Sequence, residues 1–209
     1  MQITKFAHSC VLVDSDGVRV LFDPGNFTTG FEDLTGLTAV LVTHQHPDHL
    51  DLDRLPALLA RNPQARVFTD PGSVQKLGEA GIAAQSVQPG DSLDVGTPVT
   101  VHGGRHAIIH PDIPGIPNVG YLVGGRFYHP GDSFEVPEID IEILALPTGA
   151  PWLKLSEAID FLRAVGPRTA IPIHEAVLAA PQMFYGHHER LAPAGTTVQV
   201  IEPGGSVQL

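Results

Sequence analysis

The stretch LVTHQHPDHLD, residues 41–51, gathers three histidines and an aspartate within six positions. Its first residues complete the apolar run LTAVLVT, residues 37–43, which is typical of a strand covered on both faces. Neutral imidazole and carboxylate groups are natural ligands for zinc, iron and manganese. The sequence therefore predicts a metal site at the end of a buried strand, with these candidate ligands: His44, His46, Asp48 and His49.

Pro47 divides these four side chains into two pairs. Along an extended chain, side chains two residues apart point the same way, so His44 and His46 can face one point. We expect the chain to turn at Pro47, and Asp48 and His49 to begin the following helix, where they face a second point nearby. One ion needs three or four ligands, so this stretch completes neither site and further ligands must come from elsewhere.

Three further ligands are expected at the ends of other strands. His106 follows a Gly-Gly turn in GGRHA, Asp132 follows a Pro-Gly turn in HPGDS, and His174 ends the apolar strand AIPIH. Both histidines have rivals nearby in the sequence, namely His102 and His110 for the first and His187 and His188, in a polar stretch, for the second. Five histidines and two aspartates are enough for two metal ions that share one ligand.

The rest of the chain reads as short strands and a few helices. Apolar residues recur at helical spacing in three segments, 52–62, 71–81 and 155–166. Short runs rich in branched residues predict strands in both halves, and residues 196–209 read as a final hairpin around Pro-Gly-Gly. Both halves have strands first and then helix and strand, which predicts one domain over residues 1–209 with two sheets inside and helices outside.

Composition narrows the function classes. The chain has 209 residues and a formal net charge of −11, which counts against a nucleic-acid partner because such proteins carry a basic face. Cys10 is the single cysteine, so no internal disulfide is expected. The amino-terminal residues contain no apolar signal segment, and no run approaches membrane-spanning length. We expect a cytoplasmic protein with a small-molecule substrate, and the sequence leaves a homo-oligomer open.

The motif THQHPDH resembles the H-x-H-x-D-H signature of the metallo-β-lactamase superfamily. The later histidine, the aspartate in GDS and the final histidine after a strand occur in that family's order. KFAHSC, LFDPG and HPGDS narrow the resemblance to compact metal-dependent hydrolases related to ascorbate-6-phosphate lactonase and to N-acyl-phosphatidylethanolamine phospholipase D. The resemblance covers essentially the whole chain.

This resemblance implies an α/β fold, a four-layer αβ/βα sandwich with two mixed sheets inside, helices outside and a dinuclear site at one edge. Carried over residue by residue, the first metal would be held by His44, His46 and His106. The second would be held by Asp48, His49 and His174, and Asp132 would bridge the two. Zinc is the expected ion, with manganese and iron left open by the nitrogen and oxygen ligands.

Two such ions would make hydroxide available from a bridging water at neutral pH, so we expect a hydrolase of small esters, lactones or phosphodiesters. Asp48 is expected to ligate and to orient the nucleophile, and His110 near the mouth is the candidate acid for the leaving group. The alternatives are a nuclease or RNA-processing enzyme on the same core and a non-hydrolytic di-iron redox or metal-binding protein.

Three other polar residues stay open at this stage. His8 is either a structural histidine or a pocket group, and His129 stands where a hydroxyl residue is more usual in the family. Asp23 in LFDPG is either a turn residue or the hydrogen-bond partner of a ligating imidazole.

Overall fold

The apolar runs of the two halves form two separate seven-stranded sheets, in a computed structural model that describes residues 1–209. The first sheet has this order: β14 (Ser206–Gln208), β1 (Gln2–Ala7), β2 (Cys10–Ser15), β3 (Val18–Phe22), β4 (Ala39–Val42), β5 (Arg66–Thr69) and β6 (Gln85–Ser86). The second has this order: β13 (Thr197–Val198), β12 (Thr169–Ile173), β11 (Ile143–Pro147), β10 (Phe127–His129), β9 (Val119–Val123), β8 (Pro98–Gly103) and β7 (Ser92–Asp94).

Each sheet is mixed, and both are built in the same way. Strands β1 to β3 and β7 to β10 are antiparallel to their neighbours in sequence, as short turns between them allow. Strands β3 to β6 and β10 to β13 run parallel, which requires longer crossover connections. Four helices lie in or after these crossovers: α1 (Leu55–Arg61), α2 (Pro71–Glu79), α3 (Leu155–Val165) and α4 (Pro181–Leu191).

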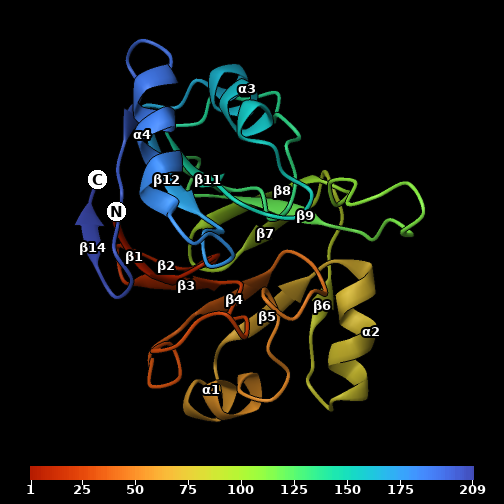
Figure 1. The fold of residues 1–209 in the computed structure, drawn as a ribbon. Helices are drawn as coiled ribbons and strands as arrows, with labels where there is room; N and C mark the ends of the chain where they lie inside the picture. Colours follow the sequence, from red (N-terminus) through yellow and green to blue (C-terminus); the bar gives the residue numbers. More distant parts are fainter.

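The two sheets face each other, and the helices lie on their outer faces (Figure 1). Helices α1 and α2 cover the first sheet, while α3 and α4 cover the second. A core cluster of 21 buried residues draws side chains from both sheets, among them Val11 and Phe22 from one and Tyr121 and Ile143 from the other. The predicted arrangement of two sheets inside and helices outside is therefore confirmed.

Helix α3 shows why the sequence pattern located the helices well. Its apolar stripe buries Ala158, Ile159 and Leu162, as the spacing predicts. Leu162 packs in one core cluster with residues of the second sheet, together with Phe161. Gly166 then adopts the left-handed conformation, with φ of 58°, and ends the helix because a residue without Cβ enters that region freely. No helix in the structure is both long and apolar enough to cross a membrane.

The predicted final hairpin is wrong. Strand β13 instead pairs in parallel with β12 of the second sheet, whereas β14 pairs antiparallel with β1 of the first sheet. Each segment thus covers the free edge of a different sheet, and Ile201 between them is buried in the shared core. Local turn residues could not reveal this, because the pairing is with distant strands.

Two helical expectations also need correction. Asp48 and His49 do not begin a helix: His49 and Leu50 donate their backbone N–H groups to the carbonyl oxygen of His46, which forms a turn, and α1 begins only at Leu55. Helix α4 was missed, because its sequence is polar, contains Gly186 and has only a weak apolar face.

Helix α4 also buries a histidine that the sequence placed in a polar stretch. His188 is fully buried, and neither of its ring nitrogens has a hydrogen-bond partner. Burial, with a smaller contribution from His187, lowers the pKa of His188 to about 4 from its ordinary 6.5. Between these values the unfolded chain binds the extra proton, so the free energy of unfolding falls as the pH falls through this window.

Replacing His188 by leucine should therefore flatten the acid limb of the stability curve. Between pH 7 and pH 4, the variant should lose about 3 kcal/mol less unfolding free energy than the parent protein. Urea titrations at a series of pH values measure this. His187→Leu, one residue away, is the control and should keep most of the parent's dependence, because burial is the larger cause of the lowered pKa of His188. Equal acid sensitivity in parent and His188→Leu would contradict the assignment.

Candidate metal centre

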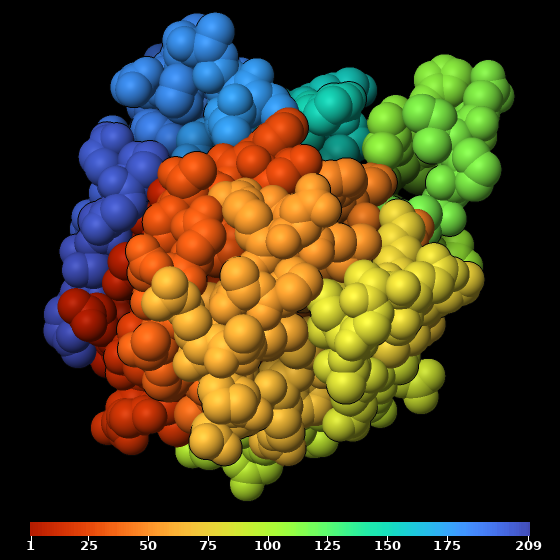
Figure 2. All heavy atoms as spheres, turned by 90° about the horizontal axis from the view of Figure 1, so that it is seen from below, coloured from red at the N-terminus to blue at the C-terminus, as the bar shows by residue number.

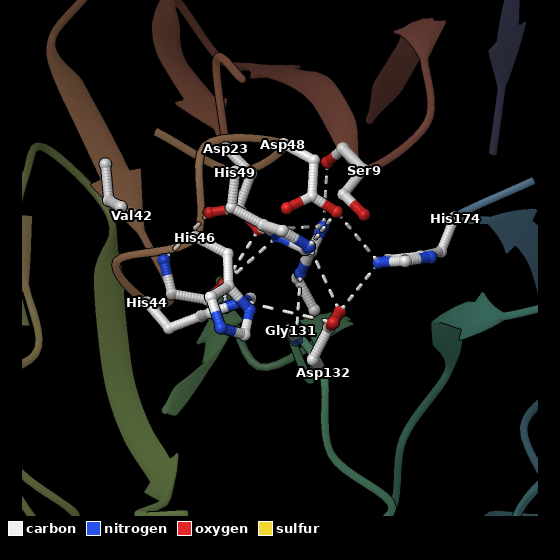
Figure 3. A network of polar contacts seen from close by, with 12 residues as sticks. Ser9, Asp23, Val42, His44, His46, Asp48, His49, Gly131, Asp132 and His174 are labelled. Carbon is white, nitrogen blue, oxygen red and sulfur yellow. Dashed lines mark hydrogen bonds and ion pairs between the residues drawn. The ribbon is translucent and has the colours of Figure 1, made fainter. Parts of the chain in front are cut away.

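Four strands end at the predicted ligands and bring them together (Figure 3). His44 follows β4 of the first sheet, and three ligands follow strands of the second sheet: His106 after β8, Asp132 after β10 and His174 after β12. The turn after His44 supplies the rest. The ligands therefore come from both sheets, which explains why they are far apart in the sequence.

The candidate ligands form two groups, in each of which the ligand atoms lie within 4.8 Å of one another. The first group is His44, His46, His106 and Asp132. The second group is His8, Asp48, His49 and His174. The structure thus brings together all seven residues that the sequence proposed, places Asp132 in the first group and adds His8 to the second.

Asp132 lies between the two groups with one carboxylate oxygen toward each. Oδ1 is 3.1 Å from Nε2 of His49 and 3.1 Å from Nε2 of His174. Oδ2 is 3.2 Å from Nε2 of His106 and 3.9 Å from Nε2 of His44. Asp132 is therefore placed to offer one oxygen to each group.

Most of the candidate histidine ligands are held by Nδ1, the ring nitrogen that points away from the centre of the cluster. In four of them, Nδ1 lies within hydrogen-bond distance of an oxygen: His44 with Thr43 Oγ1 at 3.1 Å, His49 with Asp23 Oδ2 at 2.7 Å, His106 with the Ala107 carbonyl at 2.5 Å, and His174 with the Gly149 carbonyl at 2.6 Å. Metal-bound histidines have such partners as a rule, because the contact fixes the ring and leaves Nε2 free for the ion.

Several inward-facing atoms lack a hydrogen bond of good geometry, although Nε2 of His44 lies 3.0 Å from Nδ1 of His46. Nε2 of His49, His106 and His174 and Oδ1 of Asp132 are buried without a hydrogen bond. Buried polar atoms without partners are rare because they are costly, and here they converge on one space. These residues therefore fit divalent cations, and their chemistry suits zinc, manganese or iron alike.

The imidazoles and carboxylates of the cluster shift one another's pKa values. Burial disfavours the charged form of His49, but the Asp132 and Asp23 carboxylates raise its pKa well above the ordinary value. Against the same effect of burial, Asp132 raises the pKa of His174 to about 9. Burial likewise opposes charge on Asp132, yet the His49 and His174 imidazoles hold its pKa well below its usual range. A cation that binds here must displace these protons.

Asp23 organises one histidine of each group. Its Oδ2 accepts from Nδ1 of His49 at 2.7 Å and from the Thr43 hydroxyl at 2.8 Å, and its Oδ1 accepts from the Thr43 backbone N–H at 2.8 Å. The same hydroxyl is 3.1 Å from Nδ1 of His44 and can accept its proton. Of the two readings that the sequence left open, the structure shows Asp23 as the hydrogen-bond partner of His49, which is a candidate ligand.

His8 belongs to the second ligand group, although its side chain is fully buried. Its Nδ1 accepts from the Ala176 backbone N–H at 3.3 Å, so its proton is on Nε2, which lies 3.0 Å from Oδ2 of Asp48. Burial lowers the pKa of His8 to about 4, which keeps the ring neutral. His8 therefore donates to Asp48, while burial opposes charge on Asp48 and the bonds with His174 and His8 lower its pKa.

Backbone strain is concentrated at this site. Four residues other than glycine have positive φ, and three of them are His8 at 50°, Asp23 at 42° and His174 at 63°. Each such conformation costs on the order of 1–3 kcal/mol and persists where the surroundings hold it. A backbone hydrogen bond joins two of these positions, because the His174 N–H donates to the His8 carbonyl oxygen at 3.1 Å. Three of the four strained positions thus lie at the candidate metal cluster, and the fourth, Asp16, lies in the turn between β2 and β3.

Two other histidines lie outside the ligand groups. His129 is buried and stacked on Phe22; its Nδ1 accepts from the Gly131 N–H and its Nε2 donates to the Ser9 carbonyl, so it is a structural residue. His110 lies in the loop after β8, with 61% of its side chain exposed, and lines a cavity together with His46. Its place at the rim is compatible with the predicted acid role, which stays a prediction.

Trp152 is a contact of the cluster that the sequence analysis missed. Its Nε1 donates to Oδ2 of Asp132 at 2.9 Å, and its ring packs edge-on against Phe134 and faces His106. It is the single tryptophan of the chain and follows the TGAP turn after β11. That uniqueness was the only available signal, because nothing in the local pattern connects residue 152 with residue 132.

Replacing Trp152 by phenylalanine should lower metal affinity by about 10- to 100-fold, because the ring stays while the N–H that orients Asp132 is lost. Competition with a chromophoric chelator measures this. Phe134→Leu is the matched control: it weakens the aromatic packing, leaves the N–H bond in place and should keep the parent's affinity. Unchanged affinity in Trp152→Phe would show that the bond does not position the carboxylate.

The fold and the paired clusters define a class of metal-binding sandwich protein, and comparison with known proteins places the chain within it. The model of the β-lactamase superfamily domain matches residues 2–174. The chain belongs to this superfamily and is a metal-dependent hydrolase, as the resemblance implied.

Relatives agree with this assignment. Protein Rv0786c of Mycobacterium tuberculosis is 49% identical, with 94% of each chain covered. A UPF0173 metal-dependent hydrolase of Nitratidesulfovibrio vulgaris is 31% identical over 83% of this chain and 79% of its own length. N-acyl-phosphatidylethanolamine-hydrolyzing phospholipase D 1 of Caenorhabditis elegans is 29% identical over 96% of this chain and 67% of its own length.

Solved structures confirm the fold. Igni18, a metallo hydrolase of Ignicoccus hospitalis, superposes with a TM-score of 0.76 over 99% of this chain and 97% of its own, at 24% identity. The predicted αβ/βα sandwich is thus confirmed.

Proposed function

We propose that the protein is a dinuclear-metal hydrolase that cleaves an ester, lactone or phosphodiester bond in a small molecule. One observation carries the proposal: Oδ1 of Asp132 lies 3.1 Å from Nε2 of His49 and Oδ2 lies 3.2 Å from Nε2 of His106, so the carboxylate offers one oxygen to each of the two groups. In this proposal the first metal is held by His44, His46 and His106, and the second by Asp48, His49 and His174. Zinc is the proposed ion.

The chemistry divides between the ions and the side chains. Bound at the two groups, divalent cations would generate a nucleophile from water at neutral pH and polarise the carbonyl or phosphoryl group. Asp48 is the more accessible of the two carboxylates, with 20% of its side chain exposed, and can orient that nucleophile and accept its proton. His8 holds the Asp48 carboxylate in place, because its Nε2 donates to Oδ2 of Asp48 at 3.0 Å. His110 at the rim can donate a proton to the leaving group.

Charge and relatives guide the choice of substrate. The formal net charge of −11 works against long nucleic acids, which favours a small molecule. The relative from Caenorhabditis elegans is named for hydrolysis of a phosphodiester lipid, which supports the inclusion of phosphodiesters here. A chain whose one cysteine, Cys10, is buried suits the cytoplasm that we propose as its location.

The test is an activity screen with defined metal content. Protein stripped by a chelator and reloaded with zinc, manganese or iron is assayed on panels of phosphodiesters, lactones and esters. We expect two ions per chain and hydrolysis within one panel that disappears in the stripped protein. Full activity in the stripped protein, or with a single ion per chain, would overturn the dinuclear proposal.

A further inference from the structure

The loop between β8 and β9 is unusually apolar for a segment that projects from the molecule. Residues 107–116 read AIIHPDIPGI, with four isoleucines and one charged residue. The loop extends from the end of the second sheet, and it forms the green lobe at the upper right of Figure 2. Ile108 is 78% exposed and Ile113 is 50% exposed. Large apolar side chains gathered on a projecting loop are typical of a surface that binds something.

The loop forms one wall of a cavity of about 240 Å³ that opens onto the candidate metal centre. Two proposed ligands of the first metal, His46 and His106, form the other wall. The remaining lining residues belong to the loop, from Ala107 to Ile116, and include no lysine, arginine, aspartate or glutamate. His110 is the single titratable residue of the loop that lines the cavity.

Hydrogen bonds at its base fix the loop relative to the ligands. The His106 N–H donates to the Ile116 carbonyl at 3.1 Å, which closes the stem of the loop. The Ala107 N–H donates to the backbone carbonyl of Asp132 at 2.8 Å, and the Ile113 N–H donates to the His110 carbonyl at 3.0 Å at the tip. The backbone that positions two ligands therefore also positions the apolar wall.

We propose that this cavity is a substrate subsite that binds an uncharged alkyl or acyl group while the bond to be cleaved lies over the metals. This inference rests on the proposed function. The absence of charge disfavours a phosphate or sugar, which would lose hydration without gaining partners. The volume lies below the 300–1,000 Å³ that hold a whole drug-sized ligand, so one group of the substrate fits here and the rest lies outside.

Linear carboxylates are suitable probes, because their heads are metal ligands and their tails differ only in length. Zinc-loaded protein with labelled isoleucine methyl groups is titrated with acetate, butyrate, hexanoate and octanoate, followed by NMR. Affinity should rise by up to about fourfold for each buried methylene and then level off when the cavity is full. The shifted methyl signals should belong to isoleucines of the loop, Ile109 and Ile113 among them.

Ile113→Asp places a charge in the subsite at an exposed position and should abolish the dependence on chain length. Ile139→Asp is the matched control, because Ile139 lies on a different loop and has a similar exposure, 46% against 50% for Ile113. This variant should keep the dependence of affinity on chain length. Equal affinity for all four acids, undetectable binding of octanoate, or a gradient that survives Ile113→Asp would overturn the subsite. If affinity rises with chain length but the protein hydrolyses no substrate of the three panels, the proposed function is contradicted and the subsite is supported.

Discussion

Replacing Asp132 by alanine should empty both metal groups and abolish hydrolysis. The carboxylate lies within 3.1 to 3.2 Å of three imidazoles that come from both groups, so its loss removes a ligand from each at once. Loss of a residue that merely supports a ligand costs about 10- to 100-fold in affinity, and loss of the shared ligand should exceed that at both groups. Metal analysis after dialysis and a chelator competition measure the effect.

Two variants sharpen this result. Asp132→Asn keeps the shape and one oxygen but removes the charge, so it should retain more metal than Asp132→Ala and still show little activity. His187→Ala changes the rejected rival of His174, which is a half-buried residue of α4, and should keep the full metal content. Two tightly bound ions in Asp132→Ala would show that the carboxylate does not bridge, and metal loss in His187→Ala would show that the final ligand was misplaced.

Some candidate ligands could be located in the sequence because they follow a strong local signal, whereas His106 and Asp132 were chosen from the order of residues in the resembling family. His44 and His46 follow a continuous apolar run, and His174 ends another, so the buried strands themselves indicated where side chains emerge. The fold class followed from the same runs, since strand and helix patterns in the two halves were similar. Local patterns were sufficient wherever the structure is itself organised locally.

The contacts that support the ligands could not be found in this way. Trp152 contacts Asp132 across 20 residues, and His8 contacts Asp48 across 40, without any pattern that links them. The final strands pair with the edges of different sheets for the same reason. Side chains that depend on tertiary contacts give no periodic signal, and the sequence left two readings of Asp23 open, whereas the structure shows its contact with His49.

The two halves of the sandwich contribute unequally to the site. The first sheet supplies a dense cluster from a single turn, whereas the second supplies isolated ligands at the ends of β8, β10 and β12. Correct assembly of the site therefore requires that the two sheets pack against each other in one defined orientation across the shared core. We infer that metal binding and packing of the sheets stabilise each other, since ions held between the sheets favour the folded state.

Replacing Asp23 by asparagine should weaken both metal groups while leaving every direct ligand in place. The amide must point its NH₂ either at the Thr43 N–H or at the Thr43 hydroxyl and His49 Nδ1, so a donor faces a donor in a buried position. We expect a loss of about 10- to 100-fold in metal affinity, larger at the second group because His49 is contacted directly and His44 only through Thr43. The unfolding free energy should fall by about 1–3 kcal/mol.

Asp51→Asn separates the effect on the metals from the effect on stability. Asp51 is also a buried carboxylate of this segment and accepts from the Asp53 and Arg54 backbone N–H groups and from the Arg54 side chain, but it contacts no candidate ligand. It should lose stability and keep metal affinity, whereas Asp23→Asn should lose both. If both variants lose stability alone, as measured by urea titration and chelator competition side by side, then Asp23 is a residue of the fold and not a support of the metal centre. Thr43→Val, which removes the hydroxyl next to His44, should then weaken the first group more than the second if the relay through that hydroxyl operates.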